Sequence, residues 1–360
     1  MLIIDAHLDL SWNALQWERD LRCSAYTIRT QENTMPAKGR GVGTVALPEL
    51  RRGRVALCFA TLLARSTGIP APAIDYRSVA QSYAVAQGQL AYYRALEREG
   101  LIKMITDLDG LDQHMAEWRT WDTAHPSAGD DTPPVGFVLS MEGADPIVGP
   151  DQLGEWWDAG LRLLGITHYG PGRYAGGTST ELGLTALGER LLPEMERLGV
   201  LLDLTHCSDQ AFWQALERYS GPVLASHNNC RALVPHQRQF SDDQLMAIIA
   251  RDGVIGAAFD TWMLQPGWVI GKTTNEHVSL ANVVDQIDYV CQLAGDSRHA
   301  AIGSDLDGGF GREQSPRDLD TIADLQQIAV LLDQRGYRAE ELAAIMHGNW
   351  LRCLRSAWAR

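Results

Sequence analysis

Short apolar runs recur along the chain and alternate with stretches of helical periodicity. Helical patterns occupy residues 185–198, 208–219 and 241–252, and each begins with a Ser or Thr that can cap a helix and is closed by a nearby glycine. We therefore predict parallel strands that are joined by helical crossovers. The eight runs with the composition of strands are residues 2–5, 55–63, 135–140, 161–167, 200–205, 222–226, 254–259 and 300–304.

Eight strand–helix units are the number that closes an α/β barrel, so we expect a single (β/α)8 TIM barrel domain over residues 1–360. An open, doubly wound sheet explains the strand count equally well, and the residues at the strand ends must decide. Segments 11–54 and 64–77 are expected to be long loops that follow strands and cover a pocket. The polar segment 118–134 is expected to be an insertion on the opposite face, and 318–360 to be helical throughout.

Charge and cysteine content narrow the classes of partner. The chain carries 45 acidic and 31 basic residues, a formal net charge of −14, which disfavours nucleic acid and anionic membranes and favours metal cations. No apolar run is long enough to span a bilayer, and the N-terminal segment lacks the basic start of a secretion signal. The six cysteines are dispersed without a C-x-x-C pair, so we expect reduced thiols and a cytoplasmic location.

Metal-ligand residues follow six of the eight predicted strands. In a closed barrel the carboxyl ends of the strands converge on one rim, so these side chains would meet in one pocket. This pattern favours the barrel over the open sheet and predicts a cation-binding site. The residues are His7 and Asp9, Glu142, His168, His206, His227 and Asp305.

Several of these residues have an ordinary structural explanation when taken alone. His7 and Asp9 lie two apart, so an extended strand points both to one face, although a polar strand end accounts for the pair as readily. His206 and His227 would singly be buried, hydrogen-bonded histidines, but each follows an apolar strand that ends in a small hydroxyl residue. Glu142 ends an apolar run, where a lone carboxylate costs several kcal/mol unless it is paired or binds metal.

Asp305 stands at the end of the eighth strand. The residues after it, Leu-Asp-Gly-Gly, lack the Asp/Asn spacing and closing Glu of a calcium-binding loop. We therefore interpret Asp305 as a catalytic base.

The ordered set of strand-end motifs resembles the renal (membrane) dipeptidase family of the amidohydrolase superfamily, whose members depend on zinc. Two further segments, LPELRRG before the second strand and GNWLR in the C-terminal helix, extend the resemblance over nearly the whole chain. Any one motif would be weak, but the ordered set is specific. The motifs are DAHLDL, SMEGAD, GITHYGPG, LLDLTHCS, LASHNN and IGSDLDG.

The resemblance implies two Zn²⁺ ions per chain. His7 and Asp9 would hold one ion, His206 and His227 the other, and Glu142 would bridge them. Two neighbouring zinc ions can share a water with a pKa near ~7, which gives a bridging hydroxide as the nucleophile at neutral pH.

The resemblance also assigns roles around the substrate. His168 would bind the scissile carbonyl oxygen, Asp305 would move the proton and Arg238 would receive the terminal carboxylate. Without the resemblance, Arg238 would be interpreted as a solvated loop residue. Tyr169, next to His168, is expected to shape the same substrate subsite.

These assignments predict a dipeptidase that cleaves L-Xaa-L-Xaa or L-Xaa-D-Xaa dipeptides, and the resemblance is compatible with a homodimer. Another amidohydrolase-type enzyme acting on lactams, N-acyl amino acids or phosphoesters remains the alternative, because fold does not determine substrate. A non-catalytic binding protein is disfavoured because each expected ligand position carries the residue type that it needs.

Two positions depart from the family pattern. Gly170 stands where membrane-bound relatives have a cysteine that forms a disulfide, which agrees with a reducing compartment. Asp260 stands where relatives have an aromatic residue, so the preferred substrate side chain stays open.

Overall fold

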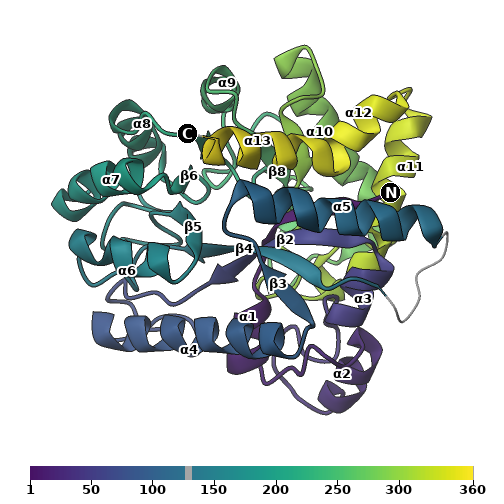
Figure 1. Cartoon of the computed structure of the whole chain (residues 1–360), viewed down its shortest axis with the longest axis horizontal. Helices are drawn as coiled ribbons and strands as arrows, with labels where there is room; N and C mark the ends of the chain where they lie inside the picture. Colours follow the sequence, from purple (N-terminus) through teal and green to yellow (C-terminus); the bar gives the residue numbers. More distant parts are fainter. Residues whose placement is uncertain (126–131, 360) are drawn as a thin grey trace.

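A ring of eight parallel strands forms the centre of the computed structural model, which describes residues 1–125 and 132–359 (Figure 1). Neighbouring strands pair in the order β7-β6-β5-β4-β2-β1-β9-β8. They coincide with the eight strands that the apolar runs predict. The strands are β1 (Ile3–Leu8), β2 (Val55–Leu62), β4 (Val135–Glu142), β5 (Leu161–Gly165), β6 (Leu201–Asp203), β7 (Val223–Leu224), β8 (Ile255–Ala257) and β9 (Ala300–Ile302).

One short contact brings the two ends of this sheet together. Ala225, just after β7, forms a parallel bridge with Ile255 of β8. The Ala225 backbone N–H donates to Val254 O at 2.9 Å, and Gly256 N–H donates to Ala225 O at 2.8 Å. The expected (β/α)8 barrel is therefore confirmed, and an open sheet is excluded.

The described residues include a ninth strand that the apolar pattern does not predict. β3 (Ile102–Met104) lies outside the ring and pairs with residues 135–137 of β4. This part of β4 is not covered by β5, whose pairing begins at Leu139. Three residues are too few to show strand periodicity, and only the uncovered edge of β4 gives them a partner.

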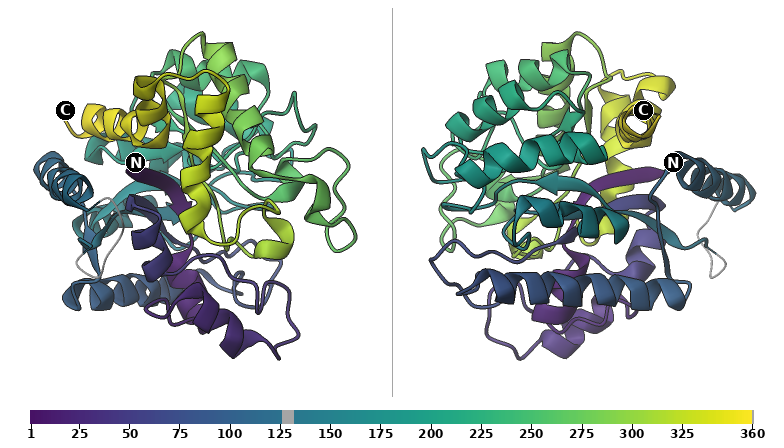
Figure 2. Two further views of the ribbon diagram at one scale, coloured as in Figure 1. Left: turned by 90° about the vertical axis from the view of Figure 1, so that its right-hand side faces the viewer. Right: turned by 60° about the vertical axis from the view of Figure 1, so that its left-hand side comes forward.

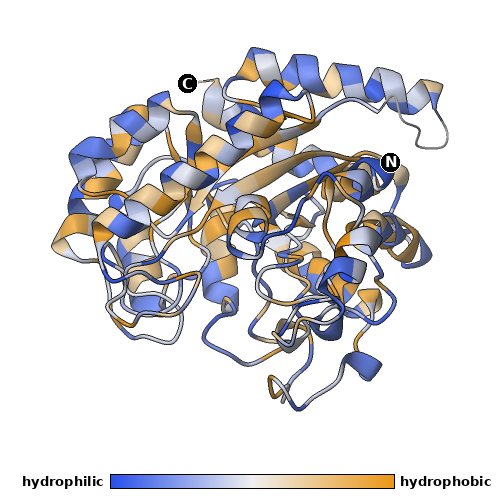
Figure 3. Ribbon diagram, turned by 90° about the horizontal axis from the view of Figure 1, so that it is seen from below, coloured by the Kyte–Doolittle hydropathy of each residue, from blue (hydrophilic) through white to orange (hydrophobic). Residues whose placement is uncertain are grey.

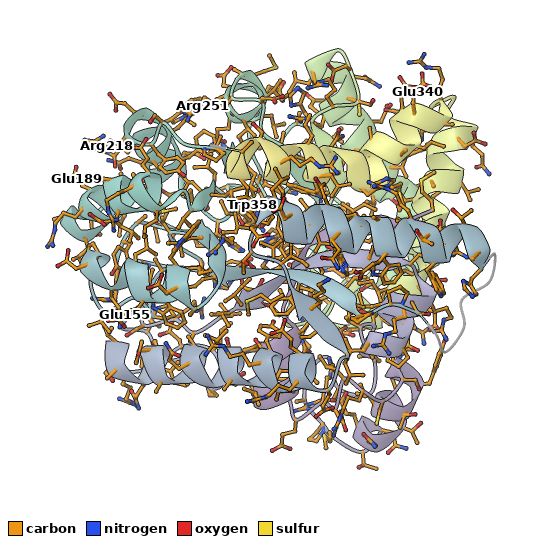
Figure 4. All side chains as sticks on the ribbon, in the orientation of Figure 1. Glu155, Glu189, Arg218, Arg251, Glu340 and Trp358 are labelled. Carbon is orange, nitrogen blue, oxygen red and sulfur yellow. The ribbon has the colours of Figure 1, made fainter. Side chains whose placement is uncertain are left out.

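Helices surround the ring, and their apolar faces pack inward (Figure 3). The three predicted helices are present as α7, α8 and α9, and the side chains of Thr185, Ser208 and Ser241 cap their first turns. The labelled Glu155, Glu189, Arg218 and Glu340 lie at the periphery and point outward (Figure 4). The helices over the barrel are α4 (Val79–Arg98), α5 (Leu108–Ala124), α6 (Leu153–Asp158), α7 (Ala186–Leu198), α8 (Asp209–Arg218), α9 (Asp242–Ala250) and α10 (Leu280–Ala294).

The C-terminal part differs from the continuous helical stretch that we expected over 318–360. α11 (Gln326–Gln334) ends before Gly336, whose φ of 89° is a conformation that favours glycine. α12 (Ala339–Ala343), a π-helical turn (Ala344–Gly348) and α13 (Asn349–Trp358) follow. Residue 360 lies outside the described residues.

The segments expected as loops have definite structure. α1 (Leu10–Gln16), α2 (Ala25–Glu32) and α3 (Leu47–Arg52) occupy 11–54 and gather on one side of the barrel (Figure 2). Segment 64–77 contains a bridge between Arg65 and Asp75. The start of 118–134 continues α5, while residues 126–131 lie outside the described residues.

Short 3-10 helices complete the described chain. They are Pro150–Gln152, Thr261–Met263, Asn275–His277, Arg312–Gln314 and Ile322–Leu325. Among the residues that the structure describes, no helix is both long and apolar enough to cross a membrane.

Two glycines allow close backbone packing at the strand end that precedes His227. A Cβ atom would lie 1.7 Å from Ser226 O at Gly303 and 2.0 Å from it at Gly256. Such distances are far below contact, so any side chain here would push these strands apart.

We predict that Gly303→Ala lowers the free energy of unfolding by at least about 1–3 kcal/mol, because the added methyl group overpacks this junction. The matched control is Gly88→Ala in the exposed part of α4, where a Cβ meets nothing within 4 Å. This control should raise stability by about 0.5–1 kcal/mol, because alanine favours helix over glycine. Urea unfolding of both variants measures the difference, and equal stabilities would contradict the packing argument.

Candidate metal centre and substrate pocket

The candidate ligands meet at the carboxyl end of the ring, as a barrel requires. His7 lies in β1, Asp9 is the N-cap of α1, and Glu142 is the last residue of β4. The remaining four each stand three residues beyond a strand: His168 after β5, His206 after β6, His227 after β7 and Asp305 after β9. Because each of these four residues follows its strand by the same number of positions, side chains that are distant in sequence meet on one rim.

Glu142 occupies the centre of this cluster. Its Oε1 atom lies 3.1 Å from His206 Nε2, 3.4 Å from His227 Nε2 and 3.6 Å from His7 Nε2. His168 approaches from the pocket side, with Nε2 3.5 Å from the same oxygen. One carboxylate oxygen thus faces four imidazole nitrogens that come from four different strand ends.

The ligand atoms form overlapping groups that could each hold a metal ion. Glu142 belongs to one group with His7 and Asp9 and to another with His206 and His227, and in each group the ligand atoms lie within 4.8 Å of one another. A third group joins His7 and His227 to Asp305. The first two groups share Glu142, which is the arrangement a bridged pair of cations needs.

Two observations fit a cation at this place. His7 Nε2 and Asp9 Oδ1 are buried without a hydrogen-bond partner, and leaving such atoms unsatisfied is costly. Burial, with the charge of Asp9, raises the pKa of Glu142 to about 8. A divalent cation would satisfy both orphaned atoms and remove the cost of gathering carboxylates, and mixed nitrogen and oxygen ligands suit Zn²⁺.

Outer hydrogen bonds orient two of the imidazoles. His206 Nδ1 lies 3.0 Å from Thr178 Oγ1, and His227 Nδ1 lies 2.9 Å from Ser226 Oγ. Because Nδ1 is engaged on the far side of each ring, Nε2 is the nitrogen presented to the centre. Such second contacts set the tautomer and direction of metal-binding histidines.

Two of these residues hold an unusual backbone conformation. His206 has φ 67° and Asp305 has φ 57°, in the left-handed region that costs a non-glycine residue of order ~1 kcal/mol or more. Strain of this kind persists where surrounding contacts enforce it, and it is common at functional sites.

A cavity of about 180 Å³ lies above the candidate centre. Its floor includes Asp9, Glu142, His206 and Asp305, while His7 and His227 are buried beneath it. The walls contain His168, Tyr169, Arg238 and other residues named below. Chemistry at the centre would therefore take place in a small, largely enclosed space.

Arg238 is a buried cation in the wall. Its side chain is 2% exposed, Nη1 donates to Asn228 Oδ1 at 2.7 Å, and Nη2 donates to the backbone oxygen of His227 at 2.9 Å. Within 1–125 and 132–359, no carboxylate lies at ion-pair distance from this guanidinium. A buried guanidinium that contacts only neutral oxygens is suited to bind an anionic group of a ligand.

Sequence reasoning missed several wall residues. Trp12, Arg65, Ile74, Trp262 and Met263 line the cavity from the segments that follow β1, β2 and β8. The position of Arg65, a basic residue just after a strand, could have drawn attention to it. A search restricted to metal ligands passes over it.

Asp260, which departs from the family pattern, lies in the wall of the cavity. Its two oxygens accept hydrogen bonds from the Gln314 amide at 2.7 and 2.9 Å. Burial raises its pKa to about 7. The carboxylate therefore changes charge readily near neutral pH.

Comparison with known proteins identifies the family. Residues 1–359 match the model of membrane dipeptidase, peptidase family M19. The chain belongs to this family. Membership places it among the metallo-dipeptidases, which are peptide hydrolases.

Individual relatives of this dipeptidase family are moderately similar in sequence. An uncharacterized protein in the pqqA 5′ region of Klebsiella pneumoniae is 31% identical over 233 residues, which cover 62% of this chain and 83% of the relative. Dipeptidase aclJ of Aspergillus oryzae is 31% identical over 225 residues, which cover 61% of this chain and 51% of the relative. The match thus spans about half the length of the fungal protein.

Two solved structures share the fold over nearly the whole chain. The dipeptidase AC, a metallo peptidase of family M19, is 26% identical with a TM-score of 0.75, covering 100% of this chain and 99% of the other. A metallo peptidase from Rhodobacter sphaeroides is 24% identical with a TM-score of 0.77, covering 99% of both chains. These likenesses agree with the barrel described above.

We predict that affinity for Zn²⁺ rises with pH. Burial alone would lower the pKa of His7, but Glu142, Asp9 and Asp305 outweigh it and raise that pKa to about 10. His7 in the metal-free chain is therefore protonated below that pH, and a cation must displace the proton to bind. Each displaced proton should change the affinity by about tenfold per pH unit. Competition with a chromophoric chelator at pH 6, 7 and 8 measures the slope, and an affinity independent of pH would contradict the assignment of His7 as a ligand.

Proposed function

We propose that this chain is a binuclear zinc dipeptidase that hydrolyses L-Xaa-L-Xaa or L-Xaa-D-Xaa dipeptides. The observation that carries the proposal is the shared position of Glu142 in two ligand groups beneath an enclosed cavity. Arg238 adds a buried cation to the wall of that cavity, and no carboxylate of the described residues lies at ion-pair distance from it. A small cavity with one anion-binding residue suits a short peptide with a free carboxylate.

The proposed ligands of the two ions divide into two sets. His7 and Asp9 would hold one zinc ion, His206 and His227 the other, with Glu142 between them. When bound, the ions would supply Lewis acidity and would make water acidic enough to provide hydroxide near neutral pH.

Asp305 is proposed to move the proton. Its Oδ1 lies 3.7 Å from His7 Nε2, and the side chain, 17% exposed, borders the cavity. Burial, with the charges of Glu142 and Asp9, raises its pKa well above the ordinary value. A more basic carboxylate accepts the proton of the attacking water more readily and can return it to the departing amine.

His168, Arg238 and Tyr169 are proposed to hold the substrate. A neutral imidazole at His168 donates a hydrogen bond to the scissile carbonyl oxygen, and this bond strengthens as negative charge develops there. Arg238 pairs with the terminal carboxylate and so sets the orientation in which the peptide binds. Burial raises the pKa of Tyr169 to about 12, so its phenol stays neutral and can donate a hydrogen bond.

The cellular setting is also part of the proposal, and the state of the cysteines supports it. All six cysteines are free thiols in the structure, and five of them are buried. We propose a single barrel domain that works in the reducing cytoplasm, with a homodimer as a compatible assembly. The acidic net charge disfavours nucleic acid as a partner.

We predict that Arg238→Met raises KM for L-Ala-L-Ala by about 30- to 150-fold, because an anchoring bidentate ion pair of about 2–3 kcal/mol is lost. Arg238→Lys should recover part of the loss, since it restores charge without the paired geometry. The matched substrate is L-Ala-L-Ala amide, which the wild-type enzyme should bind poorly and which the variant should treat like the free acid. An unchanged KM would favour a metallohydrolase of another substrate class on the same barrel.

We predict that Asp305→Asn lowers kcat by about 10²–10⁴-fold with two zinc ions retained, because the amide cannot accept the proton. Steady-state kinetics together with metal analysis of the same sample separate proton transfer from ligand loss. Removal of zinc from the wild-type enzyme by a chelator should abolish hydrolysis, and re-addition should restore it. Full activity of the metal-free protein would reject the zinc mechanism, and a near-normal kcat for the variant would reject the role of Asp305.

A further inference from the structure

We propose that Arg65 is a positioning residue that fixes His168 in the tautomer with its proton on Nε2. The inference rests on the proposed function for the use of His168 as a donor to the substrate. Arg65 itself lies outside the metal-ligand set, and it follows β2 on the opposite side of His168 from the candidate centre.

The contact between the two side chains is direct. Arg65 Nη1 lies 3.3 Å from His168 Nδ1. In the described part of the chain, Arg65 makes the only hydrogen bond to that nitrogen. The other ring nitrogen, Nε2, faces Glu142 Oε1 at 3.5 Å and therefore points toward the floor of the cavity.

The chemistry of the two groups determines the direction of this hydrogen bond. A guanidinium has only donors, so His168 Nδ1 must accept. A neutral imidazole that accepts at Nδ1 carries its hydrogen at Nε2. By donating to Nδ1, Arg65 thus keeps the hydrogen of His168 on Nε2, which faces the cavity. This is the position where the proposed mechanism needs a donor.

Arg65 is held in place from several sides. Its N–H donates to Ile74 O and its backbone oxygen accepts from Tyr76 N–H, both at 2.8 Å. Nε lies 3.3 Å from Asp75 Oδ2, and Asp75 in turn accepts from Thr67 Oγ1 at 2.7 Å. The segment 64–77 therefore folds back so that its two ends pair, and these contacts hold the guanidinium in place.

His168 is restrained on its other side. Its backbone oxygen accepts from Thr178 N–H at 2.9 Å, and its ring packs 4.3 Å from that of His206. Thr178 also contacts His206 Nδ1 through its hydroxyl, so the two histidines share one support. Arg65 is the element of this support that selects the tautomer.

The test compares zinc-loaded Arg65→Met and Arg65→Lys with the wild-type enzyme. Arg65→Met should lower kcat for L-Ala-L-Ala by about 10–100-fold with KM within about threefold, because the oxyanion donor is misplaced while the carboxylate anchor remains. Arg65→Lys keeps a hydrogen-bond donor, so its kcat should fall by less than about tenfold. Asp75→Asn removes the charge that holds the guanidinium from outside the cavity. Its kcat should lie between those of Arg65→Met and Arg65→Lys.

A spectroscopic readout separates this role from a purely structural one. Histidine labelled with ¹⁵N should show His168 protonated at Nε2 in the wild-type protein and a mixture of tautomers in Arg65→Met. The His168 signal is identified by its loss in His168→Gln. Circular dichroism checks that each variant folds. If Arg65→Met does not fold, Arg65→Lys and Asp75→Asn provide the test.

Two results would overturn the role proposed for Arg65, and a third would reject the proposed function alone. An unchanged tautomer in Arg65→Met overturns it. A rise in KM confined to dipeptides with an acidic side chain would also overturn it and would make Arg65 a substrate-binding residue. If the zinc-loaded wild-type protein hydrolyses no dipeptide, the proposed function fails, while the tautomer measurement still decides the role of Arg65.

Discussion

The structure depends on placing one carboxylate, that of Glu142, among imidazoles from four other strand ends. A buried carboxylate with Asp9 and Asp305 nearby is unfavourable without compensating positive charge. His7 supplies part of that charge in the metal-free chain, and its raised pKa reflects this demand. The same demand makes the site selective for cations, because any bound cation relieves the repulsion that the fold imposes.

Hydrogen bonds between neighbouring strand ends hold this arrangement together. Asp5 accepts from the backbone N–H and the hydroxyl of Ser304, at 2.8 and 2.5 Å, and so ties β1 to β9. Asp203 accepts from the backbone N–H groups of Thr205 and Ser226, both at 3.0 Å, and so ties β6 to β7. These carboxylates lie beneath the candidate ligands, so the contacts that complete the ring also orient the site.

The pocket above the centre contains ionisable groups of both signs in a protein of net charge −14. Arg238 and Arg65 both line it, while Asp260 adds a carboxylate whose pKa is near neutral. The Arg238 and Asp260 segments pack together, since Gln239 Nε2 donates to Met263 O at 2.8 Å. Such an arrangement orients a small zwitterion more strictly than an apolar pocket of the same size, because each charge accepts only the opposite end of the ligand.

The apolar pattern along the chain predicts the eight strands of the ring, and the residues that follow each run show which side chains stand at the strand ends. Apolar runs bounded by turn residues show burial directly, and parallel strands must send their carboxyl ends to one rim. It could not reveal β3, whose three residues form a strand only because part of β4 lacks a partner. Nor could it reveal the interruption near Gly336, where local backbone conformation ends a periodic pattern.

The tertiary structure alone decided which side chains touch. Arg65 and His168 are 103 positions apart, and Asp5 and Ser304 are 299 apart, so no local pattern connects either pair. The left-handed backbone at His206 and Asp305 is likewise decided by packing, because Asp and His tolerate this conformation more often than most other residues but do not require it. Residue identity sets what chemistry is available at each strand end, whereas the closed ring sets the distances at which that chemistry can act.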